Sequence, residues 1–163
     1  GADRAMRSVQ WPGRMQRLPQ GRLSQLAPAG SEVWIDGGHN PGAGLVVAEA
    51  LTEQEERLSR PLFLIAGMIN TKDQTGYFDA FRGIARHVYT VPVTMSDAGT
   101  PNAELAVRAA AAGLSAEPVA SVANALKLLR DTWDASEVPP RILIGGSLYL
   151  IGEVLAENGT PPT

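Results

Sequence analysis

The sequence contains no cysteine, and this absence limits the chemistry that the chain can perform. A disulfide framework, a thiolate zinc site and a cysteine nucleophile are all excluded. The two histidines, His39 and His87, fall in different parts of the sequence, so we expect no metal site either. The lack of cysteine is compatible with a reducing compartment, and we expect a cytoplasmic protein.

Long apolar runs and a surplus of basic residues are also missing. No stretch approaches the ~18 continuous apolar residues of a membrane-spanning helix, and the N-terminal arginines lack the apolar segment of a signal peptide. Lys and Arg total 14 against 17 Asp and Glu, which gives a net charge of -3 and argues against nucleic-acid binding. We therefore expect neither a membrane nor a nucleic-acid partner. The first residue is Gly1 rather than methionine, and we expect the chain to be part of a longer protein.

What the chain does contain is an ordinary globular composition. Its 163 residues are 44% hydrophobic and 19% charged, which suffices for one core. Residues 1–31 are rich in Arg, Gln, Pro and Gly, and we expect them to be an irregular segment from a linker between domains. We expect residues 32–158 to form the domain and residues 159–163 to fray.

Short β-prone runs alternate with helical patterns along the expected domain. The runs are apolar and β-branched, as buried parallel strands are, and lie at 32–36, 62–67, 87–91 and 141–146, with a shorter candidate at 118–120. Between them, apolar residues recur at helical spacing in residues 42–58, 74–85, 102–112 and 121–133, and from Leu148 to a stop at Gly159. This alternation predicts an α/β fold: a three-layer sandwich with a mostly parallel sheet and helices on both faces.

The richest loop follows the first expected strand and reads DGGHNP, residues 36–41. Ligands of open α/β sheets bind outside the carboxyl ends of the strands, so polar residues there are candidates for a site. Asp36 ends the strand, His39 and Asn40 supply polar tips, and the N-terminus of the next helix suits an anion. The alternative is an ordinary strand-to-helix turn with Asn40 as a helix cap.

Three further pieces carry charge or a hydroxyl at comparable places. Lys72 and Asp73 follow the strand at 62–67 and suit a carboxylate or phosphate, with Asp73 orienting Lys72, or else they are a solvated pair that caps a helix. Ser147 follows two glycines, and we expect it to cap the last helix with its hydroxyl at the ligand edge. Arg14, in WPGR at residues 11–14, suits a phosphate or lies solvated at the domain edge.

The order of these motifs resembles that in the C-terminal domain of folylpolyglutamate synthases and their dihydrofolate synthase relatives: WPGR, DGGHNP, KD and GGSLYLIGEVL. Enzymes of that family are ATP-dependent ligases of the Mur-ligase type. The resemblance runs from Trp11 to about Leu155 and implies the Rossmann-like C-terminal domain of that superfamily. Gly38 stands where the family usually has Ala, a change that we expect to matter little. The P-loop that holds ATP and magnesium in full-length members, G-x-x-G-K-S/T, does not occur in this sequence.

The resemblance implies a reaction as well as a fold. ATP would phosphorylate the carboxyl group of a pteroate or folate substrate, and the amine of L-glutamate would attack the acyl phosphate. The family pattern assigns catalytic roles to His39 and Lys72, cofactor contacts to Arg14, Asp36 and Asn40, and substrate contacts to Ser147 and Asp73. The Mg²⁺ that accompanies ATP would be held mainly by an N-terminal P-loop domain, so this chain would supply no metal ligand and would not ligate alone.

Two other functions stay open at this point. The chain alone is also compatible with a non-catalytic α/β module that binds a nucleotide or an anion. A serine hydrolase built from Ser147, His39 and Asp36 fits the fold class, but GGSLY is not the nucleophile motif G-x-S-x-G because its last position is Tyr149.

Overall fold

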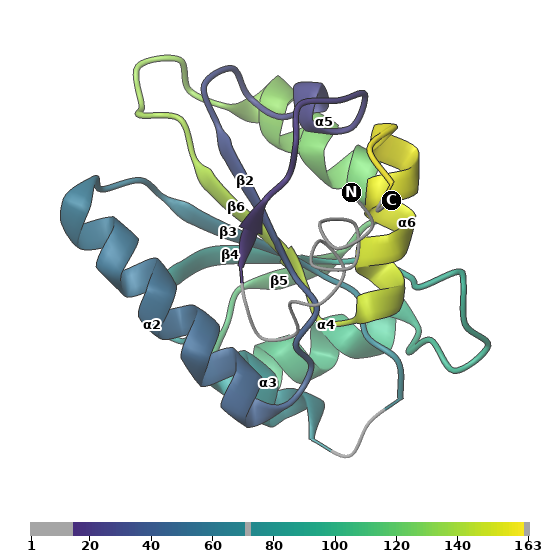
Figure 1. The fold of residues 1–163 in the computed structure, drawn as a ribbon. Coiled ribbons are helices and arrows are strands. Elements are labelled where there is room, and N and C mark those ends of the chain that lie inside the picture. The colour runs from purple at the N-terminus through teal and green to yellow at the C-terminus, as the bar shows by residue number, and fades with distance from the viewer. Residues whose placement is uncertain (1–14, 71–72, 162–163) are drawn as a thin grey trace, which may run out of the picture.

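The strands of the computed structural model, which describes residues 15–70 and 73–161, form one twisted sheet with the order β1-β2-β6-β3-β4-β5 (Figure 1). Strand β1 pairs antiparallel with β2, and every other pair in the sheet is parallel. The strands are β1 (Gln16–Arg17), β2 (Glu32–Asp36), β3 (Leu62–Ala66), β4 (Ala85–Thr90), β5 (Ala116–Pro118) and β6 (Arg141–Gly145).

Helices cover both faces of the sheet, which confirms the predicted three-layer α/β sandwich. One face packs against α2 (Pro41–Arg57), α3 (Gln74–Asp79) and α4 (Asn102–Ala111). The other packs against α5 (Val122–Thr132), α6 (Leu148–Asn158) and the short 3₁₀ turn η1 (Ser24–Leu26). In the central strands successive side chains alternate between the layers: Leu64 faces the first group of helices and Ile65 the second.

Three of the predicted elements have wrong boundaries. The short strand expected at 118–120 lies at Ala116–Pro118, on the edge of the sheet, where a proline without an N–H is tolerated. The helix expected at 74–85 ends at Asp79, because residues 80–84 form a tight turn in which Gly83 has φ = 83°. Strand β4 consequently begins at Ala85, before the expected residue 87.

Part of the segment that we expected to be irregular has regular structure. Residues 16–17 form β1, residues 24–26 form η1, and Leu18 and Leu23 are buried in the core beneath α5 and α6. Residues 15–31 are thus packed on the sheet. The division of the chain into linker, domain and tail stays a prediction.

The directions in which the chain leaves β2 and β6 indicate where a ligand-binding site would lie. The chain leaves β2 for α2 on one face and leaves the neighbouring β6 for α6 on the other. Where adjacent parallel strands send their chains to opposite faces, a crevice forms at the carboxyl edge, and ligands of this fold class bind there. Among the described helices, none is both long and apolar enough to cross a lipid bilayer.

Candidate functional site

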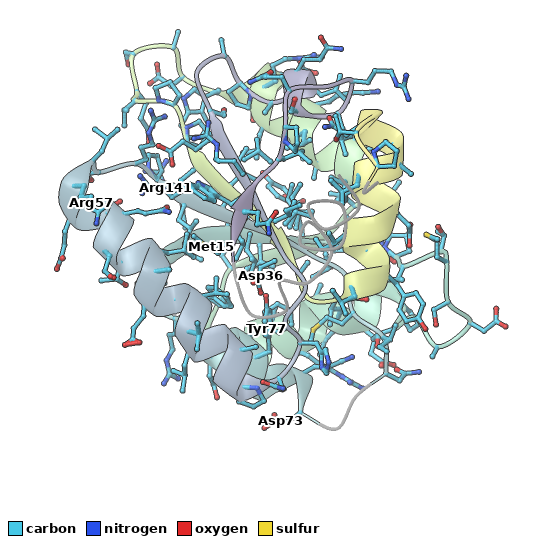
Figure 2. The ribbon with its side chains drawn as sticks, in the orientation of Figure 1. Met15, Asp36, Arg57, Asp73, Tyr77 and Arg141 are labelled. Carbon is cyan, nitrogen blue, oxygen red and sulfur yellow. The ribbon has the colours of Figure 1, made fainter. Side chains whose placement is uncertain are left out.

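Asp36 lies at the carboxyl end of β2, the strand beside β6 (Figure 2). Its side chain is fully buried, and Oδ2 accepts a hydrogen bond of 3.0 Å from the backbone N–H of Gly38. Burial raises the pKa of the carboxyl group above its ordinary value of 3.8, and the Gly38 hydrogen bond partly opposes this. A buried carboxylate at a ligand-binding edge is unfavourable for stability, so its presence marks this residue as a functional candidate.

Asn40 and His39 lie at the rim above Asp36, and both are exposed. Asn40 is the N-cap of α2, since its Oδ1 accepts a hydrogen bond of 2.8 Å from the backbone N–H of Ala43, and Pro41 occupies the first turn. The cap that was the alternative interpretation of Asn40 is therefore present. The side-chain amide of Asn40 is left to donate outward, so the cap does not exclude a ligand contact.

Ser147 is the N-cap of α6, and its hydroxyl accepts a hydrogen bond of 3.0 Å from the backbone N–H of Tyr149. The cap is therefore confirmed. The residue is only 2% exposed, so the side chain is less open to the ligand edge than the sequence suggested. Its contact with a substrate stays a prediction.

Asp73 is the N-cap of α3 and accepts a hydrogen bond of 2.7 Å from the backbone N–H of Gly76. It is exposed, and the structure thus gives it the capping role that was one of the two alternatives. Lys72 lies outside the described residues, so the proposed pair with Asp73 stays a prediction.

Arg14 also lies outside the described residues. Its neighbourhood in the chain is nevertheless informative, because Gln16 pairs with Ile35 and Arg17 with Trp34. Since β1 is antiparallel to β2, the chain enters the sheet from the carboxyl edge of β2, the edge that carries Asp36. The contact of Arg14 with phosphates stays a prediction.

Close packing holds these loops together. Asp36 and Ala66 both pair with Gly145, so three of the strands that precede candidate loops end at the same level of the sheet. A Cβ on Gly37 would lie 2.3 Å from Cδ2 of Leu148, which shows that the loop after β2 touches the start of α6.

Gly38 corrects an expectation from the sequence. The change from the usual Ala of the family pattern was expected to matter little. A Cβ at this position would lie 2.6 Å from Cβ of Ala43 and 2.9 Å from Oδ2 of Asp36, so an alanine requires the loop or the carboxylate to move. The absence of a side chain here is part of how the Asp36 carboxylate is seated.

A buried network that the sequence did not reveal supports the loop after β3. Gln74, which is 2% exposed, donates to the backbone oxygen of Ile69 at 2.8 Å and to Oγ1 of Thr100 at 2.7 Å, and accepts from Arg108. The Thr100 hydroxyl in turn donates to Oδ1 of Asn70 at 2.9 Å. These polar groups are far apart in sequence, and no local pattern indicates that they meet.

Two alternative chemistries find little support. No hydrogen bond joins Ser147, His39 and Asp36 in the described part of the chain, so the relay of a serine hydrolase is not assembled. Within residues 15–70 and 73–161, no three His, Cys, Asp or Glu side chains are grouped as a metal site requires.

Comparison with known proteins finds one curated sequence relative. No known family description matches the chain. The chain is 29% identical over 164 aligned residues to a folylpolyglutamate synthase of Lacticaseibacillus casei. This match covers 91% of this chain and 33% of that protein. The chain thus spans about a third of the length of the curated relative that it matches.

Solved structures of similar fold carry the same name. The Mycobacterium tuberculosis folylpolyglutamate synthase complexed with ADP and AMPPCP superposes with a TM-score of 0.73 at 21% identity, over 93% of this chain and 33% of that one. The Thermotoga maritima folylpolyglutamate synthase gives 0.65 at 21% identity, over 91% and 31%. A bifunctional folylpolyglutamate synthase/dihydrofolate synthase with Mn, AMPPNP and L-glutamate bound gives 0.62 at 18% identity, over 91% and 32%.

These matches confirm two predictions from the sequence. The chain resembles folylpolyglutamate synthases, and its α/β sandwich has the fold of a part of those enzymes, as expected for a Mur-ligase C-terminal domain. None of the matches bears on the roles of individual residues, which depend on the geometry above.

Proposed function

We propose that the chain is the C-terminal domain of an ATP-dependent ligase that joins L-glutamate to dihydropteroate or folate. One observation carries the proposal: the loops that resemble the ligase motifs begin at residues 36, 67 and 145, all at the same carboxyl edge of the sheet, and ligands of this fold class bind at that edge. The resemblance to folylpolyglutamate synthases in sequence and in fold supplies the reaction.

The residues at this edge fit a nucleotide. Glycines line this edge, and at Gly38 the space that a side chain would take is filled by Ala43 and Asp36, which keeps the loop close against the carboxylate. In the first turn of α2, Pro41 has no N–H and the N–H groups of Ala43 and Gly44 are bonded to Asn40, so the N–H of Gly42 is left for a phosphate oxygen. Similar proteins have been solved with ADP, AMPPCP and AMPPNP. ATP is thus the nucleotide that we assign to the site.

Each candidate residue then has a role. Asp36 accepts hydrogen bonds from the nucleotide ribose, and Asn40 donates to the phosphates with the amide that its capping bond leaves open. Arg14 binds the phosphates as a fixed cation. His39 and Lys72 lie beside the reacting groups, and Ser147 and Asp73 lie beside the glutamate. Donors aimed in advance at the negative charge of an acyl phosphate stabilise it as it forms.

The ligands of the metal that accompanies ATP are expected in another domain of the ligase. The described residues include no cluster of carboxylates able to hold Mg²⁺, so we place the Mg²⁺ ligands mainly on a P-loop domain, which is also the partner that this domain closes upon. Closure would hold amine and acyl phosphate together, an effect worth up to about 7–11 kcal/mol. The chain by itself is then a binding module that does not ligate, and the cytoplasm is its expected compartment.

The test uses Arg14 in the intact ligase. Arg14→Ala should lower kcat/KM for ATP at least about tenfold, because a charge-assisted contact to phosphate is lost. The matched control is Arg57→Ala, since Arg57 is exposed at the far end of α2 from the site (Figure 2). Wild-type kinetics in the Arg14 variant would refute the assignment.

A second measurement separates a ligase domain from an independent nucleotide-binding module. Calorimetry of the 163-residue chain with ATP and with L-glutamate should show a Kd of about 1 mM or weaker, because the phosphate cradle of the P-loop is missing. Micromolar binding of ATP by the chain alone would favour the independent module.

A further inference from the structure

Tyr77 and Asp36 form a buried polar pair between α3 and the carboxyl edge of the sheet, and in Figure 2 their side chains point toward one another. Both residues are fully buried. The position that a Cβ on Gly145 would occupy lies 3.0 Å from the Tyr77 hydroxyl and 3.1 Å from the backbone oxygen of Asp36. The hydroxyl thus reaches the end of β6 beside β2, at the level of the candidate site.

Each member of the pair has a polar atom that the rest of the fold leaves unsatisfied. Oδ2 of Asp36 accepts from Gly38, but Oδ1 has no hydrogen-bond partner among the described residues, and neither has the Tyr77 hydroxyl. Buried polar atoms without a partner are rare because desolvating them is unfavourable. A tyrosine hydroxyl can donate and a carboxylate oxygen can only accept, so the two atoms are complementary.

The electrostatics of the pair agree with this geometry. Burial raises the pKa of the Tyr77 hydroxyl, and the negative charge of Asp36 raises it further. Tyr77 therefore keeps its proton and acts as a donor. Burial also raises the pKa of Asp36, and a hydrogen bond from Gly38 opposes that shift; a second donor would oppose it in the same direction.

We propose that Tyr77 is a positioning residue: its hydroxyl and Oδ1 of Asp36 are not hydrogen-bonded in this structure, and a rotation of the carboxylate joins them and fixes its orientation beneath the DGGHNP loop. With Gly38 bound to Oδ2, both oxygens are then held from the protein side. Each carboxylate oxygen can accept a second hydrogen bond, so one acceptor position on each is left for a ligand. The use of Asp36 by a ligand rests on the proposed function, whereas the Tyr77–Asp36 bond does not.

The pair also links two of the candidate loops. Tyr77 lies one turn into α3, the helix that Asp73 caps. Close contacts hold α3 against α2: a Cβ on Gly44 would lie 2.8 Å from the backbone oxygen of Tyr77, and one on Gly76 would lie 2.7 Å from Cγ of Pro41. A displacement of the loop before α3 therefore shifts the donor to Asp36.

The decisive experiment follows the titration of the Asp36 carboxyl by NMR in the 163-residue chain labelled with ¹³C-aspartate. A hydrogen bond to the charged form lowers a pKa, so Tyr77→Phe should move the Asp36 midpoint to higher pH. The matched control is Tyr89→Phe, which removes a hydroxyl from β4 in the core layer beneath α5 and α6. An Asp36 midpoint that is the same in wild type and Tyr77→Phe overturns the proposal, whatever the stability of the variant.

Urea unfolding at pH 7 gives a second test, because Tyr77→Phe should shift the unfolding midpoint in opposite directions if the Tyr77 hydroxyl is bonded to Asp36 and if it is unpartnered. If the hydroxyl bonds to Asp36, Tyr77→Phe lowers the unfolding midpoint, and it lowers it less in an Asp36→Asn background, where the acceptor is uncharged. If the hydroxyl is truly unpartnered, its removal raises the midpoint. A midpoint at or above wild type, or an equal effect in both backgrounds, therefore also overturns the proposal.

A measurement on the unmodified chain covers the case in which Tyr77→Phe does not fold. The Tyr77 hydroxyl proton should exchange slowly enough to be observed, since it is buried and bonded to a carboxylate. A proton that is missing from the spectrum of the folded chain would count against the bond. No nucleotide or substrate is added in these experiments, so their failure is distinct from failure of the ligase assignment, which the Arg14 kinetics test.

Discussion

Asn158, the last residue of α6, accepts a hydrogen bond of 2.9 Å on Oδ1 from the backbone N–H of Leu23, which lies 135 residues earlier. The same oxygen accepts from the N–H of Ser24 at 2.9 Å, and the side-chain amide donates to the backbone oxygen of Pro19 at 2.8 Å. Asn158 itself is 1% exposed. One side chain thus replaces the backbone partners that the short turn η1 cannot supply for itself.

Replacing Asn158 by alanine should destabilise the chain. Two buried or part-buried N–H groups lose their acceptor, each at a cost of about 1–3 kcal/mol, so we expect a loss of about 3 kcal/mol in the free energy of unfolding. The measurement is urea denaturation at neutral pH. Asn124→Ala is the control, because the Asn124 side chain is exposed in the first turn of α5 and should tolerate alanine. Equal midpoints for the two variants would contradict this view of Asn158.

Gln74→Ala should weaken the support of the loop after β3. The substitution leaves Thr100 and the backbone oxygen of Ile69 without the Gln74 donor, and Arg108 with Glu104 alone as its side-chain acceptor. Since Gln74 is buried, we expect a loss of about 2 kcal/mol in unfolding free energy. Hydrogen exchange provides a local readout: the amide of Asn70, bonded to the backbone oxygen of Ala98 at 2.7 Å, should lose protection.

The control for Gln74 is Gln25→Ala, which removes an exposed glutamine from η1. It should leave both the unfolding midpoint and the protection of Asn70 near their wild-type values. If Gln74→Ala lowered global stability while Asn70 stayed fully protected, the network would be a core element without a particular role in the loop.

The elements predicted well from the sequence are those whose signal is local. In α5 the apolar residues at helical spacing, Val122, Ala125, Leu126 and Leu129, are all buried, and Ser121 caps the helix through a 3.0 Å bond from Asn124. Caps and helical periodicity depend on residues within one or two turns, so a single sequence contains them.

The parts of the site that the sequence did not reveal depend on contacts between distant segments. Nothing in the pattern of residues 74–85 indicates that Tyr77 is buried close enough to Asp36 to feel its charge, or that Gln74 bonds to Thr100, because both depend on the final packing of α3. The same holds for Gly38, whose importance comes from Ala43 and Asp36 facing it at once. Motifs located the crevice, and packing determines how its residues are held.

Gly38→Ala tests that packing directly. The added Cβ would lie 2.6 Å from Cβ of Ala43, so we expect a loss of about 1–3 kcal/mol in unfolding free energy, typical of overpacking. Gly42→Ala is the matched control: its Cβ meets only Oδ1 of Asn40, at 3.6 Å, and alanine should stabilise the start of α2 by about 0.5–1 kcal/mol. Urea denaturation of both variants gives the comparison.

The double variant Gly38→Ala, Ala43→Gly identifies the cause. If the clash with Ala43 is responsible, removing that methyl group should recover part of the lost stability, even though glycine in a helix costs about 1 kcal/mol. Purely additive losses would instead assign the effect to the contact with the Asp36 carboxylate.

The ion pair between Glu32 and Arg141 should make the stability of the fold sensitive to acid. Nε of Arg141 lies 2.9 Å from Oε1 of Glu32, and Arg141 is 2% exposed. Burial raises the pKa of Glu32, but hydrogen bonds from Arg141 and Trp34 and the nearby arginine charges outweigh it, so the pKa lies below the ordinary value of 4.5. The unfolded chain then binds this proton more readily than the folded chain does.

Stability from the Glu32 carboxylate is therefore present above pH 4.5 and lost as pH falls through the lower folded pKa. Glu32→Gln should cost about 1–3 kcal/mol at pH 7, because buried Arg141 loses the nearer of its two carboxylate partners, Glu32 and Glu55. The variant should also lose less stability than wild type on acidification. Glu49→Gln, at an exposed position of α2, should follow wild type. Urea midpoints measured at pH 7 and below pH 4.5 decide the matter: an acid-induced loss as large in Glu32→Gln as in wild type would mean that other carboxylates set the acid limit.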